Sequence, residues 1–112
     1  MNNILSQIVK LTGSGVAYTG ACIFRGFLLG TDGANDPTIT PYNNTAASGD
    51  ELVPTCTYDA SVAGLNGVTG LSPGIYCDKG IYIEITCAGA VEVSVILAPY
   101  NPSAALRWDR MK

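Results

Sequence analysis

Short apolar segments separated by clusters of Gly, Pro, Asn, Asp and Ser run along the whole chain. A strand needs only a few residues to cross a sheet, whereas an amphipathic helix needs about ten or more, so this spacing is typical of an all-β sandwich or barrel. A chain of 112 residues holds one such domain. We therefore expect an all-β fold, a small antiparallel β-sandwich of jelly-roll-like or Ig-like type, over residues 1–99.

The segment Ala21–Gly30 predicts a strand at the centre of a sheet. Phe24 lies before Gly26, and Phe27 and Leu29 follow it. A β-bulge at Gly26 would place all three large side chains on one face, because the extra residue shifts the alternation by one. Without the bulge, both faces of the strand are apolar, which again predicts a central position.

Two alternating segments, Ile81–Cys87 and Val91–Leu97, predict a β-hairpin. A two-residue turn would pair Ile85 with Glu92 and place a charge in the core. A three-residue loop instead pairs Ile85 with Val93 and keeps one face apolar, so we expect this register.

Weaker patterns predict the remaining strands. These are Ile4–Leu11 (a strand or a short arm), Thr38–Tyr42, Glu51–Tyr58 and Gly74–Cys77. Pro41 indicates that its strand lies at a sheet edge, and Pro54 indicates an edge or a bulge, because proline has no N–H to donate to a ladder. Between Asp59 and Pro73 we expect a long Gly-rich connection.

Beyond Pro99 the alternation ends, and residues 100–112 predict an extended C-terminal arm. A short helix over Ser103–Met111, with the serine as N-cap, is one form the arm would take. A helix of this length is marginal in isolation, so it would order only against a partner surface.

The arm also carries the candidate interface residues, which are Arg107, Trp108 and Arg110. Trp and Arg are the side chains most enriched at interface hot spots. Residues 1–100 carry three basic and eight acidic side chains, whereas the last twelve carry three basic and one acidic. We therefore expect the arm to dock onto an acidic neighbour, such as another copy of the chain. The few unclustered basic residues make nucleic acid an unsuitable partner.

The composition also favours association. Charged residues make up 13% of the chain, with a mean hydropathy of +0.25, against about 25% charged residues in ordinary soluble domains. So few charges leave little polar material for the outside of a small domain. Either the domain is poorly soluble alone, or partners cover part of its surface. We favour the second alternative and expect a homo-oligomer.

The sequence offers no site for catalysis or for a cofactor. It has no histidine to act as a base and no G-x-S-x-G motif, so we expect no enzyme. The cysteines are Cys22, Cys56, Cys77 and Cys87. They form no C-x-x-C pair, so we expect no metal site and, by default, free thiols, although three full disulfide pairings remain open.

Three motifs have a binding interpretation beside a structural one. Asp32, Asn35 and Asp36 resemble calcium ligands, but they lack the order of a calcium loop and fit a tight turn. Asn43-Asn44-Thr45 matches the glycosylation sequon. Tyrosines in or near loops are the remaining motif, because their rings could stack on a sugar. These tyrosines are Tyr18, Tyr42, Tyr58 and Tyr76.

The first ten residues lack a basic region followed by an apolar run, so we expect no secretion signal. No apolar run approaches the roughly 20 residues of a membrane span, so we expect no membrane partner.

Three stretches resemble small proteins encoded among the virion genes of tailed bacteriophages. They are CIFRGFLLGTDGANDPTIT from Cys22, YNNTAASGDELVP from Tyr42 and IYCDKGIYIE from Ile75. They contain the Gly-Thr-Asp-Gly turn, the polar strand, the Ser-Gly loop and the Gly-Ile-Tyr-Ile segment of those proteins. The basic arm lies outside the resemblance.

This resemblance implies a non-enzymatic role in the virion, assembled in the cytoplasm of the bacterial host. We expect a capsid decoration (cement) protein that oligomerises and bridges capsid subunits, with the major capsid protein or another virion protein as partner. A neck, tail or fibre-associated component is the alternative within the virion. A carbohydrate-binding module for host attachment is the alternative from another class.

Overall fold

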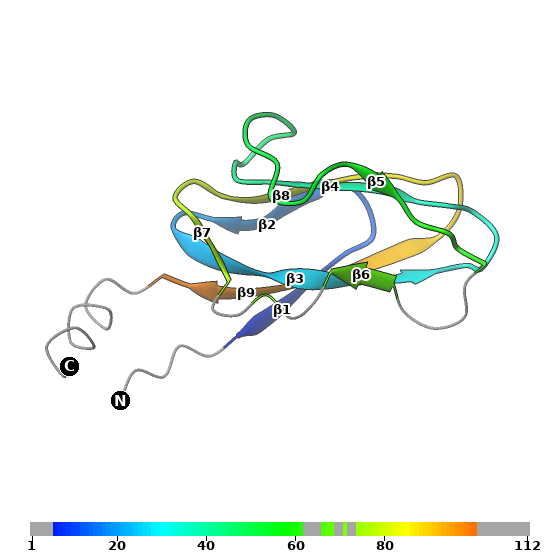
Figure 1. Ribbon diagram of the computed structural model, residues 1–112, viewed down its shortest axis with the longest axis horizontal. Helices are drawn as coiled ribbons and strands as arrows, with labels where there is room; N and C mark the ends of the chain where they lie inside the picture. Colours follow the sequence, from blue (N-terminus) through cyan, green and yellow to red (C-terminus); the bar gives the residue numbers. More distant parts are fainter. Residues whose placement is uncertain (1–5, 62–65, 69–70, 72–73, 101–112) are drawn as a thin grey trace, which may run out of the picture.

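The computed structural model describes residues 6–61, 66–68, 71 and 74–100, and these residues contain strands but no helix. The strands are β1 (Gln7–Leu11), β2 (Gly15–Thr19), β3 (Cys22–Thr31), β4 (Thr38–Tyr42), β5 (Cys56–Thr57), β6 (Asn66–Val68), β7 (Ile75–Cys77), β8 (Gly80–Thr86) and β9 (Val91–Pro99). They form two antiparallel sheets packed face to face (Figure 1). The expected all-β sandwich is therefore confirmed. None of the described residues belongs to a helix that meets the length and hydropathy of a membrane span.

The strand order identifies the type of sandwich. The five-stranded sheet has the order β1-β9-β3-β6, with β7 also paired to β3, and the four-stranded sheet has the order β2-β8-β4-β5. The chain thus pairs from its ends inward: β1 with β9, β2 with β8, β3 with β6 and β7, and β4 with β5. This long hairpin is rolled up so that β9 also pairs β3 and β8 also pairs β4. Such a double-sheet roll is a jelly roll, the first of the two expected types.

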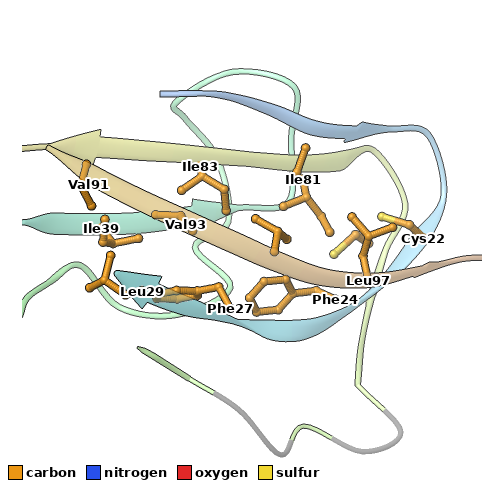
Figure 2. Close-up of a cluster of buried hydrophobic side chains, with 13 residues drawn as sticks. Cys22, Phe24, Phe27, Leu29, Ile39, Ile81, Ile83, Val91, Val93 and Leu97 are labelled. Carbon is orange, nitrogen blue, oxygen red and sulfur yellow. The ribbon is translucent and has the colours of Figure 1, made fainter. Parts of the chain in front are cut away.

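The core lies between the sheets and is built by side chains that alternate along the long strands (Figure 2). The largest fully buried hydrophobic residues are Phe24, Phe27, Leu29, Ile39, Ile81, Ile83, Val93, Val95 and Leu97. Burying each such side chain stabilises the fold by roughly 1.5–3 kcal/mol relative to leaving it in water.

The predicted bulge in β3 is present. The register with β9 shifts between Phe24 and Gly26, and Gly26 has φ +117°. Phe24, Phe27 and Leu29 consequently all point into the core, with exposures of 1% or less. β3 lies between β9 on one side and β6 and β7 on the other, so its central position is confirmed.

The predicted hairpin of β8 and β9 is wrong. The two strands lie in different sheets, and the connection crosses from one layer to the other. Their apolar faces meet across the core. At the end of β8, the Ser14 hydroxyl accepts from the Ile85 N–H (2.7 Å) and donates to the Ile85 C=O (3.1 Å). These backbone groups are the ones that the hairpin would have paired with Val93.

The predicted edge position of Pro41 is also wrong, since β4 lies between β8 and β5. However, β5 pairs only with Thr38 and Ile39, and the Pro41 C=O accepts from the Leu52 N–H (2.7 Å). The N–H and C=O of a strand residue point the same way, so the missing donor of Pro41 faces the loop and not the β8 ladder.

The remaining strands differ in extent from the prediction. Residues 7–11 of the first segment form β1, and 75–77 form β7, as expected. Only two residues of Glu51–Tyr58 form a strand, although Glu51 itself bridges Tyr42. β2 and β6 were not predicted, and β6 lies inside the expected Gly-rich connection. The C-terminal arm beyond Tyr100, with its possible helix, lies outside the described residues.

Candidate interaction surface

The outer face of the five-stranded sheet carries apolar side chains on β1, β9, β3 and β7. In the register, Ile8 of β1 is the partner of Ile96 of β9. Farther along, Ile23 of β3 is the partner of both Ala98 of β9 and Tyr76 of β7. These residues alternate with the core residues of the same strands, so their side chains point away from the four-stranded sheet.

Most of these side chains are incompletely covered, although Ala98 is fully buried. Ile8 is 64% exposed and Tyr76 is 53% exposed, whereas Ile23, Leu28 and Ile96 are half-buried. We call these five residues the apolar face. Exposed apolar side chains gathered on one face of a sheet are typical of an interaction site.

Charged side chains lie on the same outer face and are engaged locally. Lys10 and Glu92 form an ion pair with an N–O distance of 3.8 Å. The Arg25 guanidinium donates to the Ser6 hydroxyl (2.7 Å). Arg25 lies between Ile23 and Leu28 along β3, so this polar contact falls among the residues of the apolar face.

A pocket of about 370 Å³ opens at one end of the apolar face, lined by Ile23, Gly74, Tyr76 and Tyr100. The two tyrosine rings meet edge to face, with centroids 5.0 Å apart and planes at 64°. Gly74 has φ +110°, and a Cβ there would lie 2.6 Å from Ile23 Cγ2 and 2.8 Å from the Phe24 carbonyl oxygen. Glycine is therefore needed for β7 to approach β3 beside the pocket.

The outer face of the four-stranded sheet is different, because carboxylates lie on it. Tyr42 pairs with Tyr82 in the register, and the Tyr42 hydroxyl donates to Glu84 Oε1 (3.3 Å). Desolvation, and then the negative charge of Glu84, raise the pKa of Tyr42. Glu51, which bridges Tyr42, adds a second carboxylate. Carboxylates thus lie on the outer side of the four-stranded sheet, whereas the outer face of the five-stranded sheet carries the apolar face together with Lys10, Arg25 and Glu92.

The predicted turn at Asp32 is present. Asp32 Oδ1 accepts from the N–H groups of Ala34 and Asn35 (both 2.9 Å), and Oδ2 accepts from the Asn35 side chain (2.7 Å). These bonds, led by the one from Ala34, lower the pKa of Asp32 to about 2. Asp36 instead accepts from the Ala60 N–H. The described residues contain no group of three potential metal ligands, and both carboxylates hold loops together.

The first asparagine of the sequon is also engaged in a loop contact. Asn43 donates through Nδ2 to Asp78 (2.9 Å), and its Oδ1 accepts from the Lys79 N–H (3.2 Å). The side chain therefore joins the loop after β4 to the loop before β8.

The four tyrosines of the carbohydrate hypothesis do not come together. The ring of Tyr58 packs edge to face on the core residue Phe27, with centroids 6.0 Å apart. Tyr42 lies on the four-stranded sheet and Tyr76 on the five-stranded sheet. Tyr76 is instead joined by Tyr100, which sequence reasoning assigned to the arm. Tyr100 is held there because its N–H donates to the Ala21 C=O (3.2 Å).

The cysteines are free thiols in different surroundings. Cys22 and Cys77 are buried, Cys87 is half-buried and Cys56 is exposed.

The three predicted interface residues, Arg107, Trp108 and Arg110, lie outside the described residues. The comparisons with known proteins found no matching family model, no matching curated protein and no matching solved structure.

Proposed function

We propose that this protein is a non-enzymatic structural component of a bacteriophage virion, a capsid decoration protein that oligomerises and bridges capsid subunits. The observation that carries the proposal is the apolar face, which reaches from Ile8 on β1 to Tyr76 on β7. An exposed face of this kind is unfavourable in water, and burying it in an assembly removes that cost.

The low share of charged residues supports the same proposal, because a domain whose surface is partly buried in an assembly needs less polar surface. The fold is compatible with it, because jelly rolls occur in viral capsid proteins and also in lectins. One fold hosts many functions, so the weight rests on the apolar face and on the sequence resemblance rather than on the fold.

In this proposal the apolar face joins copies of the chain, and the basic arm adds a second contact. Arg107 and Arg110 of one copy would approach the carboxylates of a neighbour, of which Glu51 and Glu84 lie on the opposite face of the sandwich. Contacts that are individually weak become strong when many copies repeat them on a shell, because each bound contact raises the effective concentration of the next.

The first experiment measures the solution mass of the chain by light scattering. We expect an oligomer, and we expect the double variant Ile8→Glu/Tyr76→Glu to dissociate it. Burying the new carboxylates at an interface costs desolvation free energy that no partner charge offsets. Val16→Glu is the matched control, since Val16 is 40% exposed on the other sheet. A monomeric wild-type chain, or equal dissociation by the control, would contradict self-association through the apolar face.

The second experiment tests the role on the capsid. Capsids that carry the protein should resist heat better than capsids without it, and removal of residues 101–112 should reduce the number of bound copies. Equal heat resistance with and without the protein would rule out bracing of the shell. A few copies per virion, in place of hundreds, would favour the neck or tail alternative.

The pocket beside Tyr76 and Tyr100 favours carbohydrate binding as the second candidate function. Two aromatic rings at a surface pocket offer faces on which a sugar ring can stack. Binding on a glycan array that is lost in Tyr76→Ala, and kept in Tyr42→Ala, would support it. An array without signal would exclude it for the glycans displayed.

A further inference from the structure

Two of the four cysteines face each other across paired strands. Cys22 on β3 is the register partner of Cys77 on β7. Both side chains are fully buried at one end of the core, where Figure 2 shows Cys22. The two thiols are close enough for each to shift the pKa of the other, and the Cys77 thiol also donates to the Ile75 carbonyl oxygen (3.6 Å). The sequence alone left three full pairings open, and the register brings this one together.

The backbone geometry of such a pair suits a disulfide. Directly opposed residues in antiparallel strands have Cα atoms about 4.5–5.5 Å apart. Disulfides span Cα distances of about 4.4–6.8 Å. The other two cysteines belong to the second sheet: Cys56 lies in β5, and Cys87 follows β8 and contacts the Asn35 carbonyl oxygen through its thiol. The structure therefore pairs Cys22 with Cys77 and with neither of the others.

We propose that Cys22 and Cys77 are a disulfide-forming site, which is oxidised by a low-molecular-weight disulfide such as oxidised glutathione. One thiolate attacks the glutathione disulfide, breaks its S–S bond and releases one glutathione thiolate. The second cysteine then attacks the mixed disulfide and releases the second glutathione. Overall the two cysteine thiols lose two protons and two electrons, and one glutathione disulfide becomes two glutathione thiols. This proposal is independent of the function proposed above.

The position of β7 provides access to the buried pair. β7 has three residues, lies at the edge of the sheet and pairs only with β3 among the described strands. A short edge strand opens locally at a much lower free energy than the whole domain. In the closed state, the neighbouring Cys22 thiol and burial raise the pKa of the Cys77 thiol far above its usual value, while Cys77 lowers the pKa of the Cys22 thiol. Both side chains are fully buried in this state, so an oxidant reaches them only through the open state or during folding.

The bond would tie the edge strand β7 to the central strand β3 and close a loop that includes β4, β5 and β6. Closing a loop of this length restricts the unfolded chain, and the native register requires little distortion. We expect the oxidised chain to unfold on the order of 10 °C above the reduced chain.

The test refolds the full chain from denaturant in a glutathione redox buffer and then alkylates the remaining thiols under denaturing conditions. Refolding removes burial as a barrier to oxidation. We expect two alkylated cysteines, Cys56 and Cys87, and a linked peptide pair that contains Cys22 and Cys77. The melting temperature should fall when a reductant is added.

The variant Cys56→Ser/Cys87→Ser is the matched control and should keep the bond and the response to reductant. Cys22→Ala/Cys77→Ala should lose that response while its melting temperature stays near that of the reduced wild type. Four alkylated cysteines after refolding, or a linked pair that contains Cys56 or Cys87, would overturn the proposal.

Discussion

Gly80 begins β8 in a conformation that only glycine adopts without strain. Its φ is +139°, and a Cβ would lie 2.4 Å from the Tyr18 carbonyl oxygen of the neighbouring strand. Gly33 also has a positive φ (+82°), but a Cβ there would meet nothing within 4 Å. The two positions therefore separate the cost of backbone strain from the cost of overpacking.

We predict that Gly33→Ala destabilises the fold by about 1 kcal/mol, the strain of the left-handed region. Gly80→Ala should add an overpacking cost of about 1–3 kcal/mol. The new Cβ would meet the Tyr18 carbonyl oxygen, a backbone atom that cannot move aside by a change of rotamer. Urea denaturation of the two variants measures the difference. Equal destabilisation would show that β2 and β8 are not as close at Gly80 as described.

Asp32 gives a prediction for pH. Its carboxylate has a pKa of about 2 in the folded chain, below the value of about 3.9 for an unfolded Asp. A depressed pKa contributes stability above the unfolded pKa, and this contribution is lost as the pH falls through about 2. We expect wild type to melt above Asp32→Asn at pH 5–6, with the gap closing toward pH 2. A gap that does not change over this range would show that the charge of Asp32 is not involved.

At the residue scale, much of the core follows from the sequence. Alternation around Gly26 identifies Phe24, Phe27 and Leu29 as core residues, because only a bulge keeps all three on one face. The pocket could not be predicted. Tyr100 follows the last residue of β9, and only the strand order brings it beside Tyr76 of β7.

At the scale of the element, β8 and β9 show why alternation does not determine pairing. A strand with one apolar face buries it equally well beside a hydrogen-bonded neighbour or opposite a strand of another sheet. β8 is paired by β2 on one side and by β4 on the other, and the Ser14 hydroxyl binds the backbone of Ile85 near its end. All of these partners lie far away in the sequence. Periodicity therefore predicted both strands but not the layer of each.

We predict that Ser14→Ala destabilises the fold by about 0.5–1.5 kcal/mol, because Ile85 loses the hydroxyl that both accepts from its N–H and donates to its C=O. Thr12→Ala is the control, in the same exposed loop. Chemical denaturation of both variants provides the measurement. A neutral effect of Ser14→Ala would mean that water replaces the hydroxyl at the end of β8.

At the scale of the whole molecule, the first and the last strand complete the same sheet. β1 pairs with β9 from Gln7–Leu97 to Leu11–Val93. A pairing between chain ends is invisible in local sequence patterns, and the segment of β1 was open between a strand and an arm. The sequence therefore predicted the class of fold, whereas the nested order of strands emerges only from the complete chain.

We predict that removal of residues 1–11 leads to aggregation, because it leaves the backbone groups of the nine-residue strand β9 without a partner on one side. Removal of residues 101–112 is the control, since it leaves every described strand in place. Light scattering at several protein concentrations distinguishes the two. A truncated chain that stays dispersed while lacking β1 would show that the edge of β9 is protected in another way.

The lengths of the strands follow their position in the sheets. The strands on the margins, β1, β2, β5, β6 and β7, have five residues or fewer, while the three longest, β3, β8 and β9, each lie between two neighbours. Along one side of β3, two separate three-residue strands take the place of one continuous partner. Among the described strands, an approaching chain finds no long edge on which to extend either sheet. The described edges are therefore poorly suited to the strand-by-strand growth that produces a fibre.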